Sequence, residues 1–587
     1  MMKKLMWALI PMTLTTVAWS ATAKQPNVLL IVADDLGYSD IAPFGGEIST
    51  PNLTKVAKSG TIMSDFHAGP TCSVTRSMLL TGNDNHQAGL GTMAEYLQPE
   101  QMGKVGYEGK LNKQVMTLPE ILKNNGYRTY IAGKWHLGGS DDSLPNARGF
   151  DRSFVLVPGG ADHFKDQGLF QGYPAKYKED GQVAKLPKDF YSTDFYTDKI
   201  LSYLKDDRKK DQPFFAYVAY TAPHWPLQAP DAYLNKYKGA YQDGYDAIRQ
   251  KRLNKQIELG LIPKNTKANN PFADKLPSWD KLTPAQKAEQ TKTMQVYAAM
   301  IDNLDHNVGR ILDQLEKSGE LDNTIVMFMS DNGAESSTPE SLGTKDHTDG
   351  IRKWVDETFD NSIENMGKTN SYIALGPQWA QVSSTPYPYF KSYLANGGIH
   401  VPAIIKYPNS KQKNDINHNF MSAMDFTPTI LDITKIKRPE TNDGHKLLAL
   451  EGRSFLPTLK GKKQAERGIG WEFNTRRAYY KGDWAIQMQA PPYGTGQWEL
   501  YNRKNDPILI NNLADKEVGK TAQLAKEWDQ YAQHVGVVNA PVRYKYGQMN
   551  CFYNTCILIC AELAGDFHLG YARQLTDKSS LLFDLAF

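Results

Sequence analysis

The sequence predicts an α/β protein with a large, mainly parallel mixed sheet flanked by helices, followed by a smaller C-terminal domain with an antiparallel sheet and a helix. Three observations lead to this prediction. Short, unbroken apolar runs indicate strands that are buried on both faces. Helical patterns separate these runs, which is typical of parallel strands joined by helical crossovers. After about residue 434 the pattern changes to shorter alternating runs, which indicate antiparallel strands.

The expected elements follow one another in a regular order. The strands expected in the large sheet are 27–32, 127–132, 213–220 and Thr324–Ser330. The helices expected between them are Pro51–Ser59, Leu118–Asn124, 194–204 and 291–317. Polar, Lys-rich residues from about 240 to 290 are expected to form a helix-prone insertion over one side of the core. Runs at 471–473, 478–488 and 498–501 predict the small sheet, and 520–535 predicts its helix.

The start of the chain has the pattern of an export signal. Lys3 and Lys4 precede a short apolar stretch, 5–17, and Ala21-Thr22-Ala23 matches a small-x-small cleavage site. The apolar stretch is too short to span a bilayer comfortably. We therefore expect a cleaved signal peptide at 1–23, a periplasmic or secreted location and no stable membrane anchor. The rest is expected to divide into an α/β domain at 24–434, a small α+β subdomain at 435–540 and a tail at 541–587 to which no structure is assigned.

The overall charge is close to balance. The 587 residues include 67 Lys and Arg against 64 Asp and Glu, a formal net charge of +3. Such a balance gives the whole molecule no attraction to nucleic acids or acidic membranes. We therefore expect no nucleic-acid partner, and any specificity for anions must be local to a site.

Polar side chains follow the predicted strands at the points where the strands end. Asp34 and Asp35 follow the first strand, and Asp331 and Asn332 follow the strand Thr324–Ser330. The carboxyl ends of parallel strands are where open α/β sheets form their sites. Three carboxylates and an amide oxygen suit a hard cation such as calcium or magnesium. Each pair alone would also suit helix capping or a turn, but the two pairs together favour a metal site.

Further candidate residues occur in short motifs along the chain. Four cysteines occur, of which Cys72 stands far from the other three, Cys551, Cys556 and Cys560. A lone cysteine in an oxidising compartment is buried, paired with the tail or chemically special, and composition leaves these three open. The remaining candidates are Arg76, which follows Cys72 by four residues, Lys134 and His136 in Gly-Lys-Trp-His-Leu-Gly, His224 in Ala-Pro-His-Trp-Pro-Leu, and Lys391 upstream of Asn-Gly-Gly-Ile-His. Arg and Lys bind anions, and a loop histidine can act as acid or base near neutral pH.

At these motifs the chain resembles the sulfatases of the alkaline-phosphatase-like superfamily, in particular bacterial arylsulfatases. The resemblance extends from about residue 26 to about residue 535, and the five strings occur in the family order. It implies that Cys72 is oxidised to formylglycine (3-oxoalanine) by a formylglycine-generating machinery during export. The hydrated aldehyde is then the nucleophile that attacks a small-molecule or carbohydrate sulfate ester, releasing inorganic sulfate and an alcohol or phenol.

The resemblance also implies a role for each candidate residue. One calcium ion would be bound by Asp34, Asp35, Asp331, Asn332 and the residue at Cys72. Arg76 and Lys134 would hold the formylglycine hydroxylate and the sulfate. His136 would be the base that collapses the covalent intermediate, and His224 and Lys391 would bind sulfate and protonate or stabilise the leaving oxygen. A thiol or serine has no second hydroxyl and would stay trapped as a sulfate ester.

One departure from the family pattern leaves alternatives open. Val74 stands where the family has Pro or Ala two residues after the cysteine, and Thr75 stands where Ser is frequent. The oxidising machinery recognises this segment, and we expect conversion in the native host to be at least partial. One alternative is a phosphodiesterase or phosphonate monoester hydrolase on the same scaffold. The other is a non-catalytic protein that binds sulfated glycans with an unconverted Cys72.

Overall fold

The computed structural model describes residues 24–209, 211–268, 276–342, 351–410, 413–491 and 494–540. The expected signal peptide and the tail with its three cysteines lie outside the described residues, so the expectations about them and the domain boundaries stay predictions. Within the described residues, no helix is both long enough and apolar enough to cross a membrane.

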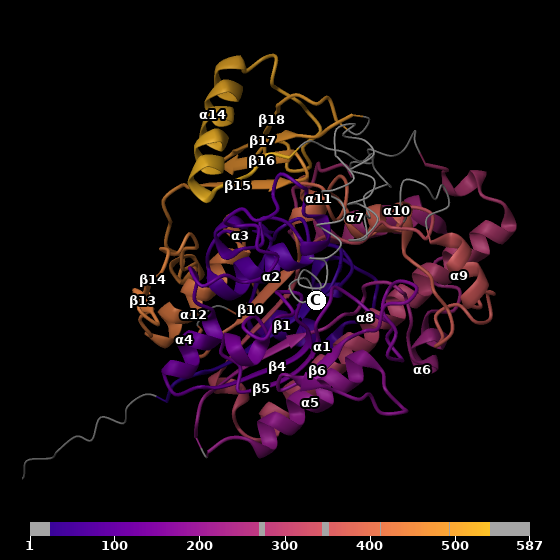
Figure 1. Ribbon diagram of the computed structural model, residues 1–587. Helices are drawn as coiled ribbons and strands as arrows, with labels where there is room; N and C mark the ends of the chain where they lie inside the picture. Colours follow the sequence, from indigo (N-terminus) through magenta and orange to yellow (C-terminus); the bar gives the residue numbers. More distant parts are fainter. Residues whose placement is uncertain are drawn as a thin grey trace, which may run out of the picture.

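A mixed sheet forms the centre of the molecule (Figure 1). In the described part of the chain it has ten strands, in the order β11-β2-β10-β9-β1-β8-β4-β5-β6-β7. The neighbouring strands β9, β1, β8, β4 and β5 are parallel, while β10 and β6 pair antiparallel at either side of this block. The bounds are β1 Asn27–Ala33, β2 Thr61–Met63, β4 Arg128–Lys134, β5 Arg152–Leu156, β6 Tyr177–Glu179, β7 Gln182–Val183, β8 Phe214–Ala219, β9 Thr324–Ser330, β10 Ala403–Lys406 and β11 Asp415–Asn417. The predicted α/β class and mainly parallel sheet are confirmed.

The predicted helices are also confirmed, two of them with longer bounds than expected. Helices α1 (Pro51–Ser59) and α4 (Leu118–Asn124) have the expected ends, and α5 extends over Ser192–Asp206. Helix α8 (Pro284–Lys317) begins seven residues before the expected start. Thr283 caps it by accepting a hydrogen bond from the Gln286 amide, and Pro284 occupies the first helical position. The Lys-rich insertion contains α7 (Gly244–Glu258).

Each strand of the central block is buried on both faces. In β1, Leu29 and Ile31 belong to the core that α1, α5 and α8 cover. Val28 and Leu30 belong to the core on the opposite face, with α2 (Cys72–Thr81), α4 and α12 (Phe426–Thr434). Because both faces are packed with apolar side chains, polar groups can reach solvent or a ligand only beyond the strand ends.

The C-terminal residues form the predicted antiparallel sheet with its helix. The sheet has the order β15 (Gly468–Phe473), β16 (Arg476–Lys481), β17 (Trp484–Met488), β18 (Glu499–Asn502), and α14 (Val518–Val535) packs against it (Figure 1). The run 478–488 is divided between two strands, because Gly482 adopts a positive φ of 56° in the hairpin turn. The Trp471 indole donates to the Ala68 carbonyl oxygen at 3.0 Å, which joins this sheet to the segment before Cys72.

Candidate active site

The ends of four parallel strands bring the predicted residues together. Asp34 and Asp35 follow β1, and Asp331 and Asn332 follow its neighbour β9, in register with it. On the other side, β8 leads to the His224 loop, and β4 ends at Lys134. The Asp35 amide donates to Asp331 Oδ1 at 3.2 Å, and the Leu36 amide donates to the Ser330 hydroxyl at 3.0 Å. The site is therefore built on adjacent ends of one sheet.

Cys72 begins α2 and lies against the carboxylates. Its Sγ is 3.3 Å from Asp34 Oδ1 and 3.9 Å from Asp35 Oδ1, and the residue is 1% exposed. Burial raises the pKa of the Cys72 thiol well above its usual value, and the charge of Asp34 adds to this effect. The unmodified side chain is thus a neutral thiol, which is a weak nucleophile. Val74, two residues on, is a core residue rather than a site residue, since it packs among the apolar side chains on that face of the sheet.

The carboxylates form a group that fits a hard cation. One oxygen each from Asp34, Asp35 and Asp331 and the sulfur of Cys72 lie within 4.8 Å of one another, all buried. Asn332 Oδ1 is buried beside them with no hydrogen-bond partner among the described residues. Burial raises the pKa of Asp34 to about 8, although Lys134 opposes this effect, and the charges of Asp331 and Asp35 raise the pKa further. A buried oxygen-rich set with an unpaired amide oxygen is what a calcium or magnesium ion requires.

Three cations surround the carboxylates. Lys134 Nζ donates to both oxygens of Asp34 at 2.9 and 2.7 Å. Arg76 is fully buried and pairs with Asp331 through Nε at 2.9 Å and a terminal nitrogen at 2.8 Å. Although burial alone would raise it, Arg76 and the two lysines hold the pKa of Asp331 at about 2. Lys391 Nζ lies 2.9 Å from Asp35. These cations can hold an anion in a region from which water is largely excluded.

The Lys391 segment is tied by its backbone to the rest of the site. The Lys391 amide donates to the Ala334 carbonyl oxygen at 3.1 Å, and the Ser392 amide donates to the Pro70 carbonyl oxygen at 2.9 Å. The segment therefore bridges the ends of β9 and the turn that leads to Cys72. This explains how a lysine far along the chain reaches the strand ends.

His136 is held through one ring nitrogen and leaves the other without a partner among the described residues. Its Nε2 lies 3.0 Å from Glu95 Oε1, and its buried Nδ1 has no hydrogen-bond partner among the described residues. Burial lowers the pKa of His136, against the effect of Glu95, so the neutral ring is favoured at neutral pH. A proton on Nε2 shared with Glu95 leaves the Nδ1 lone pair free to accept another. His136 also lines a small cavity with Ser73, the neighbour of Cys72.

His224 is held on the other side of the acidic group. Its Nδ1 is 2.6 Å from the Trp225 carbonyl oxygen, and its Nε2 is 3.5 Å from Asp35 Oδ2. His163 fixes the loop, because its Nε2 lies 3.0 Å from the His224 carbonyl oxygen. Burial lowers the pKa of His224 well below its usual value, and Lys391 and Lys134 add to the effect. The Nε2 atom is the one directed toward the group of carboxylates.

Sequence reasoning missed two carboxylates of the site. Glu335 pairs with Lys391 at 2.9 Å, and Glu95 pairs with His136. Glu335 comes just after Asp331-Asn332 and could have been considered with them, as another acid beyond the end of β9. Glu95 lies in the short helix Ala94–Tyr96, and only the fold shows that it reaches His136.

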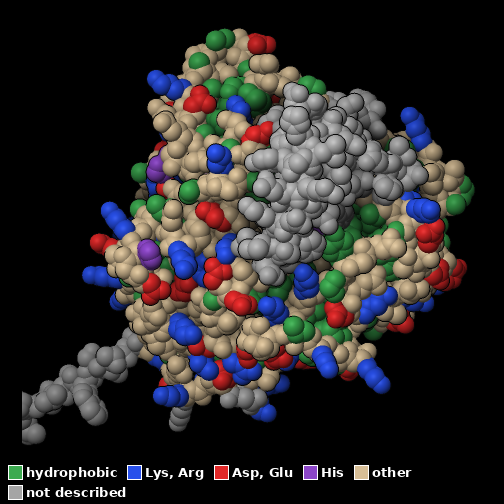
Figure 2. All heavy atoms as spheres, in the orientation of Figure 1, with side chains coloured by type: hydrophobic (Ala, Val, Ile, Leu, Met, Phe, Trp, Pro, Cys, Tyr) green, Lys and Arg blue, Asp and Glu red, His purple; other side chains and the backbone are tan. Residues whose placement is uncertain are grey.

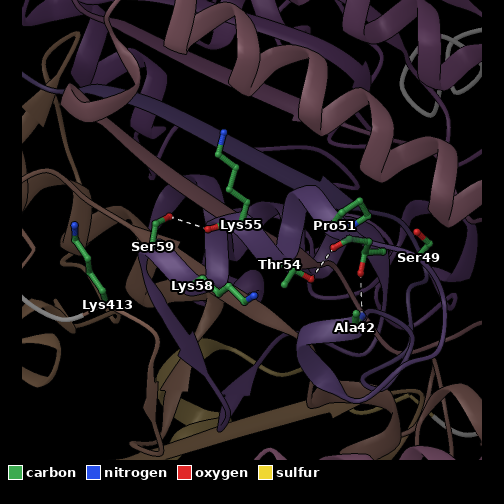
Figure 3. Close-up of a pocket in the computed structure, with 9 residues that line it drawn as sticks. Ala42, Ser49, Pro51, Thr54, Lys55, Lys58, Ser59 and Lys413 are labelled. Atoms are coloured by element: carbon green, nitrogen blue, oxygen red, sulfur yellow. Dashed lines mark hydrogen bonds between the residues drawn. The ribbon is translucent and has the colours of Figure 1, made fainter.

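A second cavity on the surface contains none of the predicted site residues. It has a volume of about 640 Å³, and Figure 3 shows its lining along α1 and the preceding turn, with Lys55, Lys58 and Lys413 around it. Lys55 is paired with Glu316 at 3.0 Å. On the face visible in Figure 2, basic and acidic side chains are interspersed, as the near balance of charge predicts. The strand ends, rather than this cavity, hold the chemistry.

The fold and the site together define a buried centre of carboxylates and cations that suits a metal ion, and comparison with known proteins gives the class of the protein. The Sulfatase family model matches residues 26–436, and a second model, N-sulphoglucosamine sulphohydrolase, C-terminal, matches residues 387–534. The chain therefore belongs to the sulfatase family and is an arylsulfatase-like enzyme that hydrolyses sulfate esters.

Individual relatives align with most of this chain. An uncharacterized sulfatase of Schizosaccharomyces pombe is 42% identical over 537 residues, covering 89% of this chain and 96% of that protein. An arylsulfatase of Klebsiella aerogenes is 39% identical over 478 residues, covering 80% of this chain and 99% of that enzyme. Among solved structures, Ps i-CgsB in complex with k-i-k-neocarrahexaose shares the fold, with a TM-score of 0.62, 22% identity and coverage of 92% of this chain and 97% of that one.

Proposed function

We propose that this protein hydrolyses aryl sulfate monoesters, using a formylglycine made from Cys72 and one calcium ion. The observation that carries the proposal is the position of Cys72 beside Asp34 and Asp35, where one group of ligands can hold both a metal ion and a nucleophile. Likeness to the Klebsiella arylsulfatase supports the aryl class of substrate. Sulfated glycans are a second class of substrate to test, because the solved structure of Ps i-CgsB is a complex with k-i-k-neocarrahexaose.

The metal ion would be held by Asp34, Asp35, Asp331 and Asn332 together with the modified residue 72. When bound, calcium supplies positive charge to the sulfate oxygens and to the nucleophile. The aldehyde hydrate of a formylglycine at position 72 would supply one hydroxyl for attack and a second that would let sulfate leave without attack by water on sulfur. Bound calcium would also keep Asp34 ionised at neutral pH, against the effect of its burial.

The side chains around the ligand group divide the remaining work. Arg76 and Lys134 would orient the nucleophile and bind sulfate oxygens, which places positive charge where negative charge increases. His136 would accept a proton at Nδ1 from the second hydroxyl, with Glu95 stabilising the charged ring. His224 and Lys391 would bind sulfate and give a proton to, or stabilise, the leaving oxygen.

Export to the periplasm or the outside of the cell is part of the same proposal. It rests on the sequence pattern at residues 1–23 and on the need for an oxidising maturation step at Cys72. An N-terminal sequence of the mature protein that begins after Ala23 would support it. A mature protein that retains Lys3 and Lys4 would contradict it.

The function is tested by coupling chemistry at Cys72 to turnover. Mass spectrometry of the peptide that contains Cys72 gives the fraction converted to the aldehyde, and sulfate release is measured on aryl, alkyl and carbohydrate sulfates and on an aryl phosphodiester. We expect aryl sulfate turnover in proportion to the converted fraction, and none in Cys72→Ala. Fully converted protein that releases no sulfate from any ester, or faster turnover of the phosphodiester, would refute the proposal.

A further inference from the structure

Glu335 completes a buried network of charges at the proposed sulfate site. Its Oε2 lies 2.9 Å from Lys391 Nζ, which also pairs with Asp35. Its Oε1 accepts hydrogen bonds from the Ser336 and Ser337 amides at 2.8 and 3.0 Å. Lys391 holds the pKa of Glu335 below its usual value although burial opposes this, so the side chain is ionised. Glu335 is therefore a fixed negative charge beside a sulfate-binding lysine.

The charges in this network can be counted directly. Among the described residues, the network has three cations and four carboxylates in two adjacent sets of ion pairs: Arg76 and Lys134 with Asp34 and Asp331, and Lys391 with Asp35 and Glu335. The Asp35 amide, which donates to Asp331, joins the two sets. Glu95 stays outside, since it pairs with His136 and its side chain is 47% exposed. With all carboxylates ionised, the network has one negative charge in excess. A bound divalent cation changes this to one positive charge, which a single sulfate monoester neutralises.

Without Glu335 the same site would hold a second positive charge. Two positive charges suit a dianion, such as a phosphate monoester or inorganic sulfate, better than a monoanion. Because the interaction energy scales with the ligand charge, a dianion gains twice the free energy that a monoanion gains from the change. The carboxylate of Glu335 thus selects against dianions by charge rather than by shape.

We propose that Glu335 is a specificity-determining residue that keeps the sulfate subsite at a net charge suited to monoanionic sulfate monoesters and weakens the binding of dianions. This inference rests on the proposed function, because it takes the strand-end site as the place where the ester binds. The one carboxylate would then have two effects. It would weaken the binding of phosphate monoesters, and it would favour the release of the dianionic sulfate product.

A purely structural role for Glu335 makes different predictions. In such a role Glu335 would position Lys391 and the loop at Ser336, and loss of the carboxylate would weaken the binding of every ligand of the site. The charge role instead predicts opposite changes in affinity for two ligands. Loss of the carboxylate should weaken the binding of the cation, which is attracted by negative charge. It should strengthen the binding of the dianion, which is repelled by negative charge.

The test compares Glu335→Gln with the wild-type protein by equilibrium binding. Calorimetry measures calcium on metal-free protein, and inorganic sulfate, inorganic phosphate at alkaline pH and methanesulfonate on the calcium-loaded protein. In Glu335→Gln we expect sulfate and phosphate to bind about tenfold more tightly, methanesulfonate about threefold more tightly and calcium about tenfold more weakly. Inhibition of aryl sulfate turnover by inorganic sulfate should become stronger to the same extent as its binding.

Two further variants separate charge from shape. Glu335→Asp keeps the charge but shortens the side chain, so its dianion and calcium affinities should stay near wild type. Glu340→Gln removes an exposed carboxylate of the same segment, which pairs with Arg352, and should change none of the affinities. Glu335→Gln that binds all ligands more weakly, or all as the wild type does, would overturn the inference.

The binding arms also distinguish this inference from the proposed function. Cys72→Ala has no side-chain heteroatom to oxidise and cannot form formylglycine, yet it keeps the charge network, and the same affinities can be measured on it. If wild-type protein shows no sulfatase turnover, the proposed function fails whatever the anion affinities are. If it turns over aryl sulfates while Glu335→Gln shows unchanged affinities, only the role of Glu335 fails.

Discussion

His86 forms a buried cation between the large α/β layer and the C-terminal sheet. It lies in α3 (Asn85–Ala88) and is 1% exposed, with Nδ1 2.8 Å from Asp84 Oδ1. Its Nε2 is 3.7 Å from Glu472 Oε2 in β15, a distance that allows charge attraction rather than a hydrogen bond. Tyr531 of α14 donates to the other oxygen of Asp84 at 2.9 Å. The His86 ring and the Asp84 carboxylate therefore connect α3 with β15 and α14, so they join both parts of the chain.

The protonation of His86 predicts how stability depends on pH. Burial alone would lower the pKa of His86, but the hydrogen bond to Asp84 and the charges of Asp84 and Glu472 raise it from 6.5 to about 9. Because the folded pKa lies above the unfolded value, the contribution to stability is complete below the unfolded value of 6.5 and is lost as the pH rises through about 9. The shift corresponds to about 3 kcal/mol when the ring is fully protonated in both states.

The assay is urea unfolding of calcium-saturated protein at a series of pH values across this window. Saturation with calcium keeps Asp34 from titrating in the same range. We expect the free energy of unfolding of the wild type to fall by about 3 kcal/mol from the low to the high end. His86→Gln should be less stable at neutral pH and should lack most of this decline. An equal decline in both proteins would show that His86 is not the group responsible and would refute the reasoning.

Three further predictions concern the site. Glu95→Gln should lower kcat about tenfold and move the acidic limb of the pH–rate profile to lower pH, since His136 loses the partner that raises its pKa; an unchanged profile would contradict this. Gly159→Ala should lower kcat by about 10- to 100-fold with little change in melting temperature, because the added Cβ would lie 2.7 Å from His136 Cε1; wild-type activity would contradict it. Calcium at 100 times its Kd should stabilise the metal-free protein by about 2.7 kcal/mol, and Asp34→Asn should lose this gain; equal stabilisation of the variant by calcium would exclude Asp34 as a ligand.

The large sheet could be predicted where strands are long, apolar and parallel. The runs that became β1, β4, β8 and β9 are buried on both faces, so hydrophobicity alone marks them. Strands β2 and β10 escaped prediction because they have only three and four residues and pair antiparallel at one side of the block. Their pairing depends on contacts distant in the chain, which a local pattern does not contain.

The residues of the site likewise fall into those that the sequence predicts and those that only the fold reveals. Asp34, Asp35, Asp331 and Asn332 follow predicted strands directly, so their convergence is a consequence of parallel order. The roles of Glu335 and Glu95 depend on contacts with Lys391 and His136 across the fold. Glu335 could have been grouped with Asp331 and Asn332 from the sequence, but its pairing with Lys391, and the pairing of Glu95 with His136, are visible only in the folded structure.

The burial of Cys72 has a consequence for the proposed conversion of this residue to formylglycine. In the finished fold the side chain is 1% exposed, lies under the carboxylates and begins a helix whose preceding segment is fastened to the C-terminal sheet by Trp471. On the proposed maturation, a catalyst that oxidises Cys72 would reach this stretch of backbone only while the chain is still open. Oxidation would then have to come before closure of the fold, and a chain that folds first would be left without the proposed aldehyde.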